Sequence, residues 1–216
     1  RSFAKDAGDY TFCVRPSYSY PFIEDNTGEI HLPLPHLLYR ATTAALLYRL
    51  TDKNDSIRDN IGRYVVESYL TKILSAASIY DEVLSECKYY LKGIEYKTPD
   101  VSIRSKDSVL FIESKSSVPP VSIRWLNQET NSKYVENIAK AIQQLYKQIK
   151  HFLSGKFNFF SGTDSSTRKM ENTWGIVSLL EDSFISREVV YKEFAQIANI
   201  DIDGDEYKWI IITKIR

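Results

Sequence analysis

A predicted β-hairpin that begins at Asp100 constrains the fold of this chain more than any other feature. Asp100 opens the extended stretch Val101–Arg104, and the polar turn Ser105–Ser108 follows it. The apolar run Val109–Ile112 then leads into the tripeptide Glu113-Ser114-Lys115. This pattern is typical of a hairpin whose second strand is apolar until its end.

The end of this hairpin gathers three charged side chains. Because side chains alternate along a strand, Glu113 and Lys115 should share a face while Ser114 points away. With Asp100 at the same edge, two carboxylates and one ammonium converge, a set that could hold a divalent metal and act on a phosphodiester. The alternative is that these residues are only surface charges of the hairpin.

Pro99-Asp100 followed by Glu113-Ser114-Lys115 resembles the motif of the PD-(D/E)xK nuclease superfamily, the fold of many restriction and recombination nucleases. The resemblance implies that Asp100 and Glu113 bind Mg²⁺ (or Mn²⁺). Lys115 would then position or activate the attacking water and offset charge on the phosphate. It further implies a Mg²⁺-dependent deoxyribonuclease that hydrolyses the phosphodiester bonds of DNA.

Two further site residues follow from the same resemblance. Glu67 lies in the middle of a strongly apolar predicted helix, and it matches the first-helix glutamate of several members of the superfamily. It would then be a catalytic residue and a metal ligand; otherwise it is a solvent-facing or paired glutamate. The helix after the Glu-x-Lys strand often contributes a glutamine near the scissile phosphate, and Gln143 or Gln144 could match. Both could equally be surface glutamines.

The charge distribution indicates where DNA would lie. The 216 residues carry no net charge, which counts mildly against a dedicated nucleic-acid binder. Residues 101–156, however, hold nine Lys/Arg against four Asp/Glu, an excess of five positive charges around and after the candidate site. We expect Lys140 and Lys147 on the following helix, and Arg124 in the loop before it, to contact DNA. A solvated helix face would explain the same charges.

The totals describe an ordinary globular chain. Hydrophobic residues make up 43% and charged residues 26% of it. Only two cysteines, Cys13 and Cys87, are present, which indicates a reducing compartment, so a cytoplasmic location is expected. No segment has the length of a transmembrane helix, so no membrane partner is expected.

The order of predicted elements gives the fold class. Helices are expected near 35–50 and from Ser56 to Ala77, and an amphipathic helix from about Lys133 to Leu153. Residues 83–97 supply a strand before the hairpin, 174–180 a buried strand, 185–199 a short helix and 207–215 a final strand. We therefore predict an α/β domain with a mixed central β-sheet flanked by helices. The resemblance adds a restriction-endonuclease-like core. Residues 1–55 would form an N-terminal extension with a helix, and residues 56–216 the nuclease-like domain.

The cellular role stays open between two classes. Nuclease domains of this superfamily are frequently effectors of a larger bacterial defence or restriction system, and we expect this chain to be a piece of a longer polypeptide. A partner ATPase or sensor protein, and an oligomer, would fit such a role. The rival hypothesis is a catalytically silent nuclease fold that serves as a scaffold for protein assembly or nucleic-acid binding.

Overall fold

A computed structural model describes residues 22–32, 35–42, 55–116, 128–161, 168–180, 185–201 and 210–214. The chain divides into two compact units. The first comprises residues 1–59 and 119–132, and the second comprises residues 60–118 and 133–216.

The described part of the first unit begins with a short antiparallel ribbon. Strands β1 (Ile23–Glu24) and β2 (Ile30–His31) flank a turn in which Gly28 has a φ of 85° that favours glycine. Helix α3 (His36–Thr42) confirms the first part of the predicted helix near 35–50, and residues 43–50 lie outside the described ranges.

The predicted helix from Ser56 to Ala77 is confirmed, but its middle is wound differently. It consists of α5 (Asp55–Ile61), the π-helical segment η1 (Gly62–Glu67) and α6 (Ser68–Ala76). A Cβ on Gly62 would lie 2.6 Å from Ser116 Oγ, so the glycine allows η1 to approach the end of the candidate-site strand. Short π-helical segments occur frequently at functional sites.

A five-stranded mixed sheet forms the centre of the second unit. Its strands, in spatial order, are β3 (Glu82–Ser85), β6 (Val101–Ser105), β7 (Ser108–Lys115), β8 (Thr173–Leu179) and β9 (Ile210–Lys214). Strand β6 pairs antiparallel with β3 and with β7, whereas β7, β8 and β9 run parallel. The predicted hairpin is β6–β7, and Lys106 with a φ of 53° forms its tight turn. The prediction of an α/β fold with a mixed central sheet is confirmed.

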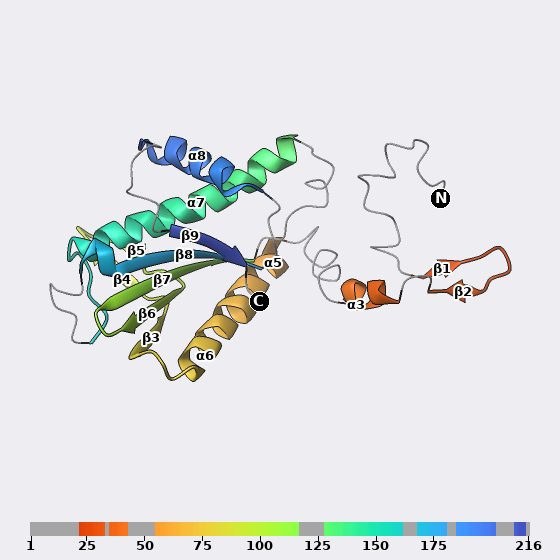
Figure 1. Ribbon diagram of the computed structural model, residues 1–216, viewed down its shortest axis with the longest axis horizontal. Coiled ribbons are helices and arrows are strands. Elements are labelled where there is room, and N and C mark those ends of the chain that lie inside the picture. The colour runs from red at the N-terminus through yellow and green to blue at the C-terminus, as the bar shows by residue number, and fades with distance from the viewer. Residues whose placement is uncertain are drawn as a thin grey trace. The chain divides into compact units, whose positions relative to one another are not determined.

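Helices cover both faces of this sheet (Figure 1). Helices α7 (Gln128–Leu153) and α8 (Arg187–Ala198) lie on one side, and α6 lies on the other. Val101, Ile103 and Ile112 form a core cluster with Leu70 and Leu74 of α6. The 3-10 turn η3 (Met170–Asn172) leads into β8.

The α7 side of the sheet is packed closely. A Cβ on Gly175 of β8 would lie 3.1 Å from Leu145 and 3.2 Å from Ile149, so the glycine lets α7 approach the sheet. Phe111 of β7 meets Phe152 of α7 edge to face, with ring centroids 5.2 Å apart. The predicted helix from Lys133 to Leu153 and its apolar face are confirmed, since every member of that face is buried: Val135, Ile138, Ala139, Ile142, Leu145, Tyr146, Ile149 and Phe152.

A second hairpin interrupts the chain between β3 and β6. Strands β4 (Lys88–Leu91) and β5 (Ile94–Lys97) form a separate antiparallel sheet, where the sequence predicted only a strand before Asp100. Thr98 N–H donates to the Cys87 carbonyl oxygen over 2.9 Å, and Cys87 N–H donates to Thr98 Oγ1 over 2.8 Å. These two bonds close the base of the hairpin.

Aromatic side chains anchor the same hairpin to the end of α7. Tyr89 and Tyr96 stack with centroids 5.6 Å apart, and the Tyr89 hydroxyl lies 2.9 Å from His151 Nδ1. Phe157 packs against Tyr89 with centroids 4.6 Å apart.

Across the helices that the structure describes, none is both long and apolar enough for a bilayer crossing.

Candidate active site at the end of strand β7

Sheet register brings the two predicted carboxylates together. Val101 is paired with Ile112, and one step further along this antiparallel ladder Asp100 comes opposite Glu113. Directly opposed residues of such a ladder point to the same face. Glu113 follows Phe111 by two positions and so shares the face that α7 covers. Both carboxylates are buried, with 7% and 2% of Asp100 and Glu113 exposed.

Ser114 holds the Asp100 carboxylate in place. Its backbone N–H and its hydroxyl both donate to Asp100 Oδ2, over 2.7 and 2.8 Å. Within the described residues these are the hydrogen bonds that the Asp100 carboxylate accepts, which leaves Oδ1 for another ligand. Alternation along the strand predicted that Ser114 points away from the site, but at the end of the strand its hydroxyl turns to Asp100.

Glu113 and Lys115 share a face, as alternation along the strand predicted. Lys115 Nζ donates to Glu113 Oε1 over 2.8 Å. The other oxygen of Glu113, Oε2, is buried and has no hydrogen-bond partner among the described residues. Lys115 is 31% exposed, so the ammonium lies where the buried pair meets solvent.

Burial controls the ionisation of the pair. Burial raises the pKa of Glu113 to about 7, and the neighbouring charge of Asp100 adds to the effect. Burial also raises the pKa of Asp100, although the two bonds from Ser114 oppose the rise. For Lys115, burial lowers the pKa, but the charge and hydrogen bond of Glu113 together with the charges of Asp100 and Glu67 outweigh it, so the pKa is raised and the ammonium stays charged.

The residues present fit a divalent cation at this position. A buried carboxylate oxygen without a partner is rare in folded proteins, because leaving it unpaired costs free energy. Carboxylate oxygens are also the side-chain ligands that Mg²⁺ prefers. A cation at Glu113 Oε2 would give this oxygen the partner that it lacks and would favour the ionised form of both carboxylates.

Glu67, the third predicted metal ligand, lies at the end of η1, which packs against β7. Its negative charge raises the pKa of Lys115, so the structure brings Glu67 near the ammonium. Asp100, Glu113 and Glu67 do not bring three ligand oxygens within 4.8 Å of one another. Its role in binding metal stays a prediction.

The glutamines of α7 differ from one another in their surroundings. Gln144 is exposed, and Gln143 Nε2 donates to the Ile197 carbonyl oxygen of α8 over 3.2 Å. The helical period predicts that Gln148 lies on the solvent side of the helix, but Gln148 is only 5% exposed, so that prediction is wrong. Its Nε2 donates to the Lys97 carbonyl oxygen over 3.1 Å, three residues before Asp100. Gln148 therefore ties α7 to the segment that delivers Asp100.

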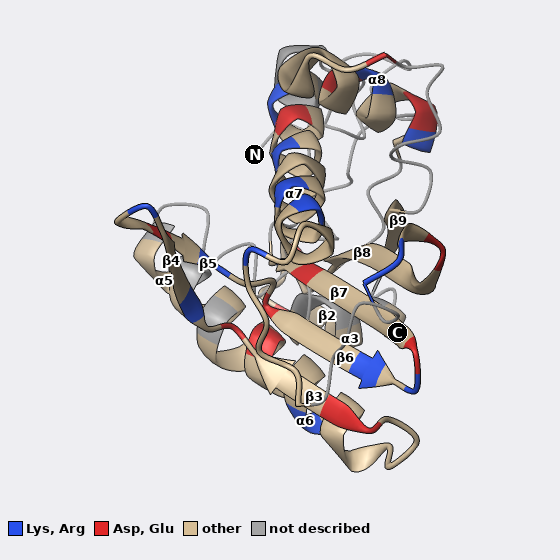
Figure 2. Cartoon of the chain, turned by 90° about the vertical axis from the view of Figure 1, so that its left-hand side faces the viewer, with Lys and Arg blue, Asp and Glu red and all other residues tan. Residues whose placement is uncertain are grey.

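The predicted DNA contacts lie partly outside the described residues. Lys140 and Lys147 are exposed on α7, where lysines recur along the helix (Figure 2). Lys140 pairs with Glu136 one turn earlier. Arg124 falls within residues 117–127, which the structure does not describe.

A third carboxylate, Glu86, stands beside the pair and was missed by the sequence analysis. Its charge raises the pKa of Asp100 and of Glu113. Glu86 directly follows β3, and only the pairing of β3 with β6 shows that it is a neighbour of Asp100. No local pattern in the sequence carries that information.

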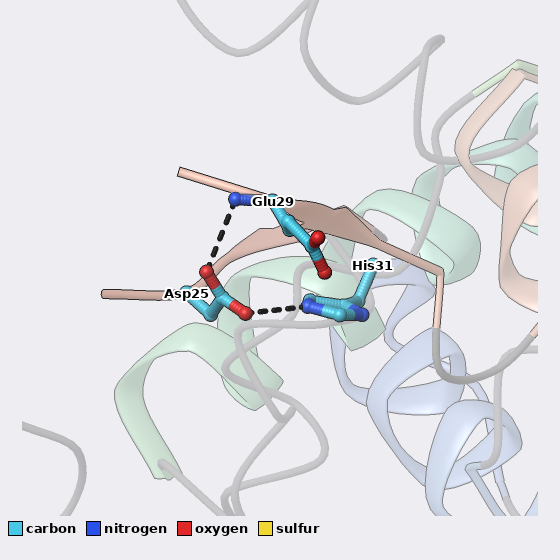
Figure 3. Close-up of side chains that lie close together, drawn as sticks. All are labelled: Asp25, Glu29 and His31. Carbon is cyan, nitrogen blue, oxygen red and sulfur yellow. Dashed lines mark hydrogen bonds and ion pairs between the residues drawn. The ribbon is translucent and has the colours of Figure 1, made fainter. Parts of the chain in front are cut away.

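In the described part of the chain, one group of three side chains offers possible metal ligands within 4.8 Å: Asp25, Glu29 and His31 (Figure 3). All three are exposed. Asp25 Oδ1 accepts bonds from the Thr27 hydroxyl and the Glu29 N–H, and Oδ2 lies 2.8 Å from His31 Nε2. The hydrogen bond from Thr27 is the largest of the causes that lower the pKa of Asp25. The three side chains lie together because these contacts stabilise the turn between β1 and β2.

Comparisons of the chain with family models, with curated proteins and with solved structures found no match.

Proposed function

We propose that this chain is a metal-dependent nuclease that hydrolyses DNA phosphodiester bonds. The observation that carries the proposal is the buried pair of opposed carboxylates, Asp100 and Glu113, with Lys115 bonded to one of them and a buried Glu113 oxygen that has no partner in the part of the chain that the structure describes. An isolated buried charge is costly, so three ionisable groups at one strand end indicate a site that a further charged ligand completes.

The fold supports the same proposal. Apart from the inserted β4–β5 hairpin, a helix, a strand, the β6–β7 hairpin, a second helix and a strand parallel to β7 follow one another, which is the order expected for the PD-(D/E)xK superfamily. A restriction-endonuclease-like core is therefore part of the proposal. So is a role as the effector of a larger defence or restriction system.

The residues have distinct roles in this proposal. Asp100 and Glu113 would hold Mg²⁺ or Mn²⁺, and such an ion lowers the pKa of bound water and shields the phosphate charge. Ser114 fixes the orientation of Asp100 through its two hydrogen bonds. Lys115, held by Glu113 at the solvent boundary, offers an ammonium to the negative charge that develops on the phosphate.

Cleavage of supercoiled plasmid tests the proposal. Wild type, Glu113→Gln and Lys115→Ala are compared with Mg²⁺, with Mn²⁺ and with EDTA, and Glu171→Gln serves as the control at an exposed carboxylate. We expect metal-dependent nicking by the wild type and the control, and a loss of at least about a hundredfold in both site variants. Equal nicking by wild type and Glu113→Gln would refute this site. No cleavage by the wild type, together with no metal binding, would favour the scaffold.

A further inference from the structure

Three carboxylates occupy one row across neighbouring strands. The β3–β6 ladder ends with Ser85 opposite Val101, and its next step brings Glu86 opposite Asp100. The Glu86 N–H donates to the Asp100 carbonyl oxygen over 3.0 Å, so the register continues through this step. Asp100 is in turn opposite Glu113. Opposed residues point to the same face with Cβ atoms about 5 Å apart.

Lys97 holds the outer member of this row. Lys97 Nζ lies 2.8 Å from Glu86 Oε1, and this pair joins the two ends of the β4–β5 hairpin. With Glu86 bonded to Lys97, the three carboxylates of the row do not bring their oxygens within 4.8 Å of one another. The ammonium is a solvent-accessible counter-charge, because 43% of the Lys97 side chain is exposed.

An independent observation points to a ligand within the row. Glu113 is 98% buried, and its Oε2 has no hydrogen-bond partner among the described residues. The hydroxyl of Ser102, two positions after Asp100 on β6, is also buried without a partner. A cation with its waters would satisfy such oxygens, whereas a further carboxylate alone would only add repulsion.

We infer that Glu86 is a third carboxylate of the metal site, which a divalent cation recruits from Lys97. This inference rests on the proposed function and adds a ligand that the resemblance does not supply. The cation replaces the ammonium as the counter-charge of Glu86. Loss of the Glu86 carboxylate should therefore weaken metal binding, whereas loss of the Lys97 ammonium should strengthen it. A merely structural ion pair would not produce these opposite effects.

Calorimetric titration of the chain with Mn²⁺ tests the inference. We expect Glu86→Gln to weaken Mn²⁺ binding by about tenfold or more. Lys97→Met should tighten it severalfold, because Glu86 then no longer needs to leave a partner. Glu95→Gln and Lys88→Met are matched controls, since this pair belongs to the same hairpin and is 3.0 Å apart. The controls should bind Mn²⁺ like the wild type.

The outcomes separate this inference from the proposed function. Binding that Glu113→Gln abolishes but Glu86→Gln leaves unchanged overturns the inference alone. No Mn²⁺ binding by the wild type overturns both. Circular dichroism in EDTA checks that each variant is folded. If Glu86→Gln does not fold, Lys97→Met decides, and unchanged or weaker binding by that variant overturns the inference.

Discussion

The raised pKa of Glu113 predicts an unusual dependence of stability on pH, which Glu113→Gln should remove. Burial and the charge of Asp100 raise the pKa of Glu113 from 4.5 to about 7. Between these values the folded protein keeps a proton that the unfolded chain has released. The contribution to stability is therefore full below pH 4.5 and is lost as pH rises through 7.

The magnitude follows from the two pKa values. Each pH unit between them corresponds to about 1.4 kcal/mol of unfolding free energy, so the whole contribution is about 3 kcal/mol. For a folded unit of this size, that free energy corresponds to a midpoint shift of roughly 6–12 °C. Glutamine has nearly the same shape but cannot ionise, so this part of the pH dependence should vanish.

Urea unfolding of the metal-free protein at several pH values between 4.5 and 8 measures the effect. Tryptophan fluorescence reports the transition, and the difference between wild type and Glu113→Gln cancels the titrating groups that do not interact with Glu113. Glu171→Gln, at an exposed carboxylate, is the control and should parallel the wild type. Parallel curves for wild type and Glu113→Gln would show that this carboxylate ionises like one in water, and would refute the reasoning.

Three further outcomes follow from the site and its support. In differential scanning fluorimetry, Mg²⁺ should raise the thermal midpoint more at pH 8 than at pH 5, because protons compete with the cation for the carboxylates. At a Mg²⁺ concentration a hundred times the dissociation constant, the gain in unfolding free energy is about 2.7 kcal/mol. Equal midpoint shifts at both pH values would contradict this expectation. Ser114→Ala removes one of the two bonds to Asp100 and should weaken Mn²⁺ binding by about tenfold in calorimetry, with Ser154→Ala as the exposed control. Gly175→Val should cost about 1–3 kcal/mol in urea unfolding, since its side chain would collide with α7, and a neutral result would mean that α7 does not pack as closely as described.

A DNA-binding measurement addresses the basic helix. Replacing Lys140 and Lys147 by Gln should weaken binding of duplex DNA alike for all sequences and reduce the salt slope by about 2. Fluorescence anisotropy at several salt concentrations measures both. An unchanged slope would exclude α7 from the DNA interface, with Lys169→Gln as the exposed control on another element.

Local patterns in the sequence predicted the individual helices and strands. They could not predict the contacts between distant segments, which the sheet register and the packing determine. Alternation and apolar runs predicted the β6–β7 hairpin, and the helical period predicted α7 with its buried face. Gln148 was misplaced because amide side chains are usually exposed, whereas here a backbone carbonyl partner stabilises one inside. The close approach of Gly62 in η1 to Ser116, just after β7, is a contact that the helical period does not encode.

The same distinction applies to the site. Asp100, Glu113 and Lys115 could be predicted because one hairpin carries all three. Glu86 could not, because its position beside Asp100 is fixed by a ladder that the β4–β5 hairpin interrupts in sequence. Ser114 was missed for a different reason, since strict alternation fails where the strand ends.

The closed base of the β4–β5 hairpin separates what the molecule could recognise from the chemistry that the candidate site could perform. The bonds between Cys87 and Thr98 hold the chain at the point where it leaves and re-enters the sheet. Residues 90–95, at the tip of the hairpin, can lengthen, shorten or change composition while this base and Lys97, the partner of Glu86, stay in place. Evolution, or a designer, could therefore exchange this tip to alter what the molecule recognises while its chemistry stays constant.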